Sequence, residues 1–163
     1  MATAIAQVTV IAVRLLTILN VDLGAGADLS DTDAVDFGDF TAPKASLPFL
    51  AIGLPSIETD IIENTTLTEW SCKSTWRIEG WIADSTDGKP VGRLATAASF
   101  ANRVIGAIQD DHKSGGASSL QDYLTAVPRF NDFDFHGKSE HDGQAYAQFS
   151  VEVVLEYRTT AGI

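Results

Sequence analysis

Apolar and polar residues alternate most strictly near the C-terminal end of the chain. Residues 145–158 place one set of side chains on each face, with Val154 as the exception, which predicts a half-buried strand. Residues 71–83 alternate in the same way and predict a second strand. The residues expected on the buried faces are Cys72, Ser74, Trp76, Ile78, Ile82, Ala145, Ala147, Phe149, Val151, Val153, Leu155 and Tyr157.

Two further segments are expected to be strands. Residues 47–54 form a short apolar run that Pro55 closes, and Pro48 places its start at a sheet edge or just before the strand. Residues 127–135 carry spaced aromatic residues and predict a strand with an irregularity. Residues 136–143 contain two glycines and predict a turn.

Helical spacing dominates the segments between these strands. Residues 91–109 predict the longest helix, and residues 118–126 predict one or two helical turns. Residues 2–19 favour an amphipathic helix, but their Val, Ile and Thr content keeps a strand open as the alternative. In the long helix the apolar stripe is expected to be Leu94, Ala97, Ala98, Ala101, Val104, Ile105 and Ile108, and the polar side Arg93, Thr96, Asn102, Arg103 and Gln109.

The order of these elements is helix, strand, strand, long helix, strand, strand. Strands linked as hairpins, with helices collected on one face, predict an α+β fold with two layers. We expect a mainly antiparallel sheet of about four to five strands with two main helices on one face. The length of 163 residues predicts one domain over 1–163.

Residues 20–46 show neither helical spacing nor strand alternation and are expected to form a long acidic loop. They contain six aspartates, and no basic residue occurs between Arg14 and Lys44. Loops of this length are usually functional or disordered. The segment therefore predicts either a solvated loop or an acidic arm that meets a basic partner surface.

The charge balance narrows the class of partner. Eleven basic and 22 acidic residues give a net charge of −11, which argues against nucleic-acid binding and against docking on anionic lipid. The single cysteine, Cys72, allows no intrachain disulfide and indicates a reducing compartment. We expect no secretory signal and no membrane span, because Arg14 interrupts the N-terminal apolar stretch.

Candidate catalytic residues are few. A hairpin tip could bring Asp134, His136 and His141 around a divalent metal, although a solvated turn explains the same composition. Asp110, Asp111 and His112 are interpreted as a solvated helix end. Cys72 is expected to be a buried, inert thiol. We therefore predict no catalytic residue, no metal and no cofactor, and hence a protein that is not an enzyme.

Residues suited to protein contacts stand out more clearly. Trp81 and Tyr146 fall on the polar faces of their predicted strands, and such residues are enriched at interfaces. Together with the acidic segment they favour a chain that works by assembly. The candidate interface residues are Asp31, Asp33, Asp36, Asp39, Trp81 and Tyr146.

The layout resembles the tail terminator, or tail completion, proteins of long-tailed bacteriophages. The resemblance rests on the order of elements and on four stretches: LPFLAIG at 47–53, STWRIEGWIA at 74–83, LATAASFANRVIGAIQDD at 94–111 and GQAYAQFSVEVVLEYRTT at 143–160. The last stretch closes on Tyr157-Arg158, a pair typical of that family. The acidic segment 20–46 departs from the family in length and charge.

This resemblance implies a structural virion protein. It implies a ring, usually a hexamer, that caps the tail tube, ends its polymerisation and joins it to the head-side connector or neck protein. Genome DNA would pass through the lumen without specific binding, and a negative lumen would repel its phosphates. The implied location is the head-proximal end of the tail in the virion, after assembly in the bacterial host cytoplasm.

Three other functions stay open from the residues alone. The chain could be another neck, head-completion or tail component. It could be a small metal-dependent enzyme built on Asp134, His136 and His141. It could also be a monomeric binding module with an acidic arm.

Overall fold

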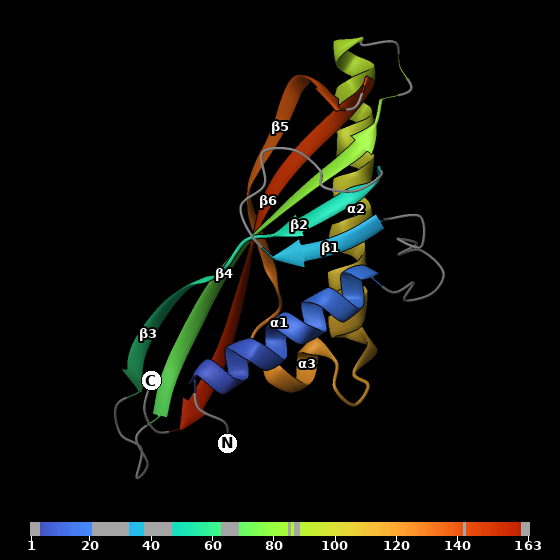
Figure 1. Cartoon of the computed structure of the whole chain (residues 1–163). Coiled ribbons are helices and arrows are strands. Elements are labelled where there is room, and N and C mark those ends of the chain that lie inside the picture. Colours follow the sequence, from blue (N-terminus) through green and yellow to red (C-terminus); the bar gives the residue numbers. More distant parts are fainter. Residues whose placement is uncertain are drawn as a thin grey trace.

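The computed structural model describes residues 4–20, 33–37, 47–62, 69–84, 86, 89–141 and 143–160. Within them six strands form one sheet in the order β1-β2-β4-β6-β5, and β3 pairs with β4 beside β2 (Figure 1). Only the β1–β2 pair is parallel, so the chain has the expected α+β fold with a mainly antiparallel sheet. The strands are β1 (Asp33–Phe37), β2 (Phe49–Ile52), β3 (Ser56–Ile62), β4 (Glu69–Ala83), β5 (Arg129–His141) and β6 (Gln144–Thr160).

The two longest strands form the centre of the sheet. All 15 residues of β4 pair with β6, from Glu69 opposite Thr160 to Ala83 opposite Tyr146. This register places the apolar rows predicted for residues 71–83 and 145–158 side by side on one face. That face carries the main core, which includes Trp76, Phe149 and Tyr157. The alternation therefore predicted both strands and the face that each one buries.

The helix α2 (Pro90–Ser114) covers this inner face. Phe100 of α2 packs edge-to-face on Phe149 of β6, with ring centroids 5.5 Å apart. Gly80 on β4 makes this approach possible. A Cβ atom at Gly80 would overlap the Phe149 ring, with Cζ at 2.7 Å, and would lie 3.0 Å from Cε1 of Phe100.

Two further helices complete the helical layer. The helix α1 (Ala4–Asn20) forms as expected for residues 2–19 and buries Ile11, Leu15, Ile18 and Leu19. The short α3 (Leu120–Tyr123) confirms the turns expected in 118–126. Both lie near the C-terminal end of α2 (Figure 1). No helix in the described residues is both long and apolar enough to cross a membrane.

Sequence patterns missed or misplaced several elements. β1 lies within the segment expected to be a loop, and β3 has no predicted counterpart. β5 continues to His141, so the turn expected over 136–143 is wrong for most of its length. The irregularity expected in 127–135 is confirmed, because the β5–β6 register shifts between Asn131 and Asp134.

Two neighbouring residues of α2 also differ from the prediction in their burial. Arg93, expected on the polar side, is buried, whereas Leu94 from the predicted apolar stripe is half exposed. Arg93 is buried because its Nε donates to Oδ2 of Asp84 at 2.8 Å. The backbone N–H of Thr86 donates to the other Asp84 oxygen at 3.0 Å. These bonds join the end of β4 to the start of α2.

We predict that replacing Gly80 with alanine destabilises the fold by about 1–3 kcal/mol, because the new methyl group overlaps Phe149. Gly106 within α2 is the matched control, since a Cβ there meets nothing within 4 Å. Gly106→Ala should stabilise the protein by about 0.5–1 kcal/mol. Urea unfolding of both variants measures the difference. Equal stability of Gly80→Ala and wild type would contradict this packing.

The free energy of unfolding should also fall in acid, because Asp84 becomes protonated there. Hydrogen bonds from Thr86 and then Arg93 lower the pKa of Asp84 to about 2. Because the folded-state pKa is depressed, the stabilisation is complete above the ordinary pKa of about 3.9 and is lost as the pH falls through about 2. The difference in unfolding free energy between wild type and Asp84→Asn should therefore shrink between pH 4 and pH 2. A difference that does not change over this range would contradict the assignment.

Candidate interaction surfaces

The outward side of α1 is an apolar surface without acidic residues. Arg14 is the single charged residue in Ala4–Asn20. The inward side of the helix belongs to the core, yet Val10 and Val13 on the outward side are 37% and 59% exposed. A helix that is apolar on both sides normally has partners on both sides. The outward side of α1 is therefore a candidate contact surface.

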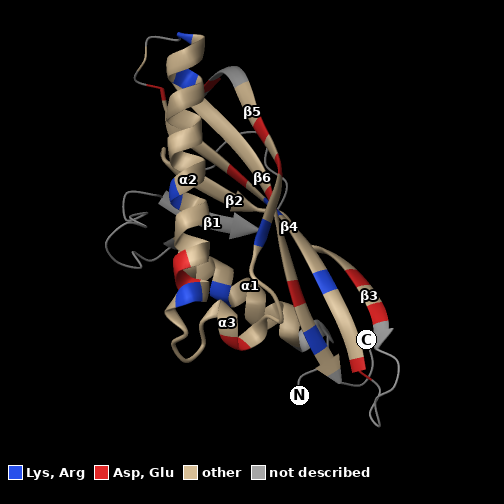
Figure 2. Cartoon of the chain, turned by 180° about the vertical axis from the view of Figure 1, so that it is seen from behind, with Lys and Arg blue, Asp and Glu red and all other residues tan. Residues whose placement is uncertain are grey.

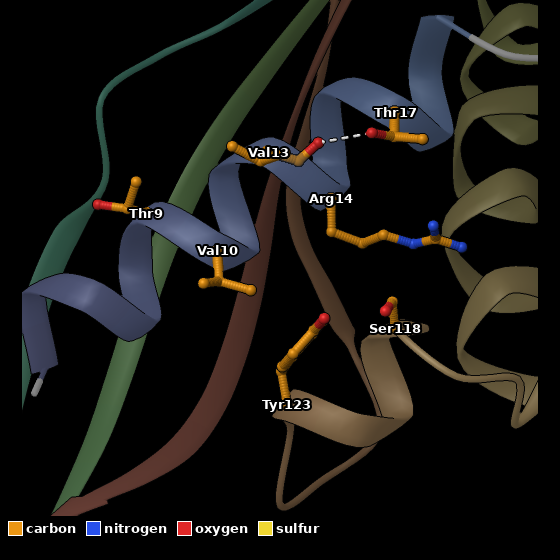
Figure 3. Close-up of a pocket in the computed structure, with 7 residues that line it drawn as sticks. All are labelled: Thr9, Val10, Val13, Arg14, Thr17, Ser118 and Tyr123. Atoms are coloured by element: carbon orange, nitrogen blue, oxygen red, sulfur yellow. Dashed lines mark hydrogen bonds between the residues drawn. The ribbon is translucent and has the colours of Figure 1, made fainter. Parts of the chain in front are cut away.

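A cavity of about 380 Å³ lies along this side of α1. Figure 3 shows Val10 and Tyr123 on facing sides of it, with Ser118 nearby on the segment that enters α3. Thr17 donates from its hydroxyl to the carbonyl of Val13 at 2.9 Å, so its polar group is satisfied within the helix. Two valines, four hydroxyl-bearing residues and Arg14 line the cavity, so it combines apolar and hydrogen-bonding surface.

Asp111 holds this part of the molecule together. It is buried near the end of α2, and both of its carboxylate oxygens accept hydrogen bonds from the Arg14 guanidinium. The backbone N–H of Leu120 donates to Oδ2 at 2.9 Å. The hydrogen bond to Asp111 also raises the pKa of Arg14 above its ordinary value. One carboxylate thus connects α1, α2 and the start of α3.

This role corrects the interpretation of the helix end as solvated. Asp110 is exposed as expected, but Asp111 is not. Its partner Arg14 lies 97 residues away in the sequence, so no local pattern could identify the pair. The one available signal was that Arg14 is an isolated charge within an apolar helix.

A second apolar surface borders the free edge of β5. Phe133 and Phe135 are 46% and 37% exposed, although β5 is paired along its other edge with β6. Leu94 of α2 is 50% exposed and Ala98 is partly exposed. We call these four residues the β5 surface.

Leu94 and Ala98 lie on the same side of α2 as His112. Leu94, Ala98, Ile105 and His112 follow one another at intervals of four, seven and seven residues, which places them along one side of the helix. His112 lines a cavity of about 230 Å³ with Leu124 and Val127, on the segment that enters β5. Arg93 and Gly92 instead contact Asp84 and Thr86, beyond the end of β4.

The exposed position predicted for Trp81 and Tyr146 is wrong. Both lie on the sheet face opposite the helices, as the alternation indicates, but both are buried. Trp81 packs on Phe49, with ring centroids 5.6 Å apart. Phe49 and Ala51 come from the apolar run of β2, which is buried on both faces, and they form a second small core with Trp81 and Tyr146. These two aromatic residues therefore stabilise the chain that carries them.

The acidic candidates are only partly located. Asp33 and Asp36 lie in β1, next to β2. Asp31 and Asp39 lie outside the described residues. The role of the four aspartates in an interface stays a prediction.

The candidate metal ligands do not converge within the described residues, where no group of three His, Cys, Asp or Glu side chains could hold an ion. Asp134 and His136 are two residues apart on β5, and Oδ2 lies 3.5 Å from Nε2. The side chain of His141 lies outside the described set. Cys72 is buried as expected, and burial raises the pKa of its thiol.

A search against models of known protein families found no match, and a search of the curated proteins found none either. The resemblance to tail terminators therefore stays a prediction that rests on the layout of the chain.

We predict that Asp111→Ala destabilises the protein by about 2–3 kcal/mol. The substitution leaves the Leu120 N–H and the Arg14 guanidinium without their acceptor, and hydrogen bonds to charged groups are worth about 1.5–3 kcal/mol. Because Arg14 retains some contact with water, the loss should stay below the value for a fully buried pair. Asp110→Ala is the neighbouring control and should leave the unfolding free energy within about 0.5 kcal/mol of wild type. Equal effects of the two substitutions would contradict the role of Asp111.

Proposed function

We propose that this chain is a structural virion protein of a long-tailed bacteriophage, which forms a ring, usually of six copies, at the head-proximal end of the tail. The ring caps the tail tube, ends its polymerisation and presents the joining surface to the neck or head-tail connector protein. In this role the chain carries no catalytic residue and no cofactor.

The feature that carries the proposal is the presence of two different apolar surfaces on one small fold. The outward side of α1 exposes Val10 and Val13, and the β5 surface exposes Phe133 and Phe135. A closed ring uses head-to-tail contacts, so each subunit needs two unlike patches that fit each other. The fold contains the helices and strands that underlie the resemblance, with β1 and β3 as additional strands between α1 and α2.

The acidity of the chain fits passage of DNA through such a ring. A net charge of −11 makes specific binding of phosphates unfavourable and would keep the genome from adhering to the lumen. Acidic side chains are spread over β3, β5 and β6, as Figure 2 shows. The tail tube and the connector are the remaining partners of the proposal.

Tail tubes and heads of a long-tailed phage that encodes this chain provide the test. We expect the purified chain, carrying a gold label, to appear at one end of each tube in electron micrographs and to stop elongation when tube subunits are added. Labelling of portal-bearing heads instead would indicate a head-completion role. Absence of label from tubes and heads alike would overturn the proposal.

A further inference from the structure

We propose that the outward side of α1 in one chain packs on the β5 surface of the next chain, so that copies join head to tail. This inference rests on the proposed ring and names the two surfaces that build it. The occupant of each surface is a second copy of this chain.

The contribution of α1 is an uncharged helical side. Its one charge, Arg14, donates to Asp111 inside the same chain. Figure 3 shows the Arg14 side chain extending toward α2. Val10 and Val13, three residues apart, lie on adjacent turns of the same side. Arg14 and Gln7 have partners within the chain, since the Gln7 amide donates to the Tyr123 carbonyl at 3.5 Å, and the remaining side chains that line the cavity on α1 are apolar or carry a hydroxyl.

On β5, the positions of the exposed phenylalanines depend on the register shift in the strand. The register shift between Asn131 and Asp134, with Asp132 at φ +48°, adds one residue to the strand. Phe135 is paired with Phe149 and shares its inner face. Since side chains alternate along a strand, Phe133 lies on that face too. Two phenylalanine rings thus occupy the helix-side face at the sheet edge.

Both rings stay partly exposed in the described chain, at 46% for Phe133 and 37% for Phe135. Phe149, the partner of Phe135, packs against Phe100 of α2, so α2 lies over β6 at this level. The exposed apolar residues of α2 are Val91 and Leu94, at 81% and 50%, and Ala98 is partly exposed. We place α1 of a second copy on these partly exposed rings, because the outward side of α1 is the apolar surface that such a contact requires.

Charge favours α1 over two other exposed apolar surfaces as the partner of β5. Asp132, Asp134 and Glu140 are exposed along β5, and two β5 surfaces packed on each other would oppose these carboxylates. The corner formed by Leu54 and Ile57 is also apolar, but Glu58 and Asp60 follow it directly on β3. α1 carries no acidic residue, so its approach to β5 brings no like charges together.

The two surfaces lie on different parts of the fold, so the contact is heterologous. Each chain can use α1 toward one neighbour and β5 toward the other, which produces a ring if the rotation closes. Val13→Glu should block the first surface, and Phe133→Glu should block the second. Val13 and Phe133 are 59% and 46% exposed, so both variants should fold, which circular dichroism checks, and urea unfolding measures the stability that each one retains.

Light scattering over a concentration series tests the contact. We expect the mass of the wild type to rise above the 17.4 kDa of one chain, and each variant to stay at that mass. An equimolar mixture should give a 1:1 dimer that grows no further, because Val13→Glu keeps its β5 surface and Phe133→Glu keeps its α1. Leu54→Glu, at a 79% exposed residue outside both surfaces, is the control and should assemble like the wild type.

Several results would overturn the inference. Assembly of Phe133→Glu like the wild type, with Val13→Glu monomeric, would show contact between two α1 helices. Loss of assembly in Leu54→Glu would place the contact on β3. A wild type that stays at 17.4 kDa at its highest soluble concentration would exclude contact through these surfaces alone.

The outcome can be separated from that of the proposed function. If the two variants form the 1:1 dimer but the wild type binds no tail tube, the contact between α1 and β5 is supported and the proposed function is wrong. If wild type and Val13→Glu cap tail tubes equally well, the proposed function is supported and the contact between α1 and β5 is wrong.

Discussion

The pairing of β4 with β6 is the constraint on which the other parts of the molecule depend. It joins residues about 60 to 90 positions apart in the sequence and fixes which face of each strand is buried. The inner face then receives α2, whose Phe100 packs on Phe149 because Gly80 leaves the space. Three strands pair directly with these two, β2 and β3 with β4 and β5 with β6, and β1 pairs with β2. A shift of this register by one residue would place the apolar rows of one strand in water.

The same constraint creates the surfaces proposed to act in assembly. Phe100 of α2 packs on Phe149 of β6, and Phe133 and Phe135 of the outer strand β5 stay partly exposed. Because Asp111 holds Arg14, α1 is fixed on the fold with its uncharged side outward. A buried ion pair is weak evidence for net stability, but it can specify one arrangement among several. Here the Arg14–Asp111 pair would orient α1 for a neighbour.

The fold was predictable from the sequence where a pattern was long and local. The alternation in residues 71–83 and 145–158 and the helical spacing of residues 91–109 identified β4, β6 and α2. β1 and β3 were missed because Asp33–Phe37 and Ser56–Ile62 are short and rich in acidic residues, and only their pairing with longer strands makes them regular. The burial of Arg93 was not predicted, because it depends on Asp84, nine residues before it in the sequence, as a buried partner.

The candidate sites were less predictable, since burial depends on what lies across the sheet. Alternation assigned Trp81 to the correct face, but only the register with Phe49 shows that this face holds a second core. The surfaces that the structure favours, at Val13 and Phe133, carry residues that look like ordinary core residues in the sequence.

The mass of the purified chain in solution tests the central claim most directly. Self-assembly through two unlike surfaces predicts a mass that rises with concentration from 17.4 kDa to one closed species of about six chains. A mass that stays at 17.4 kDa up to the highest soluble concentration would contradict it.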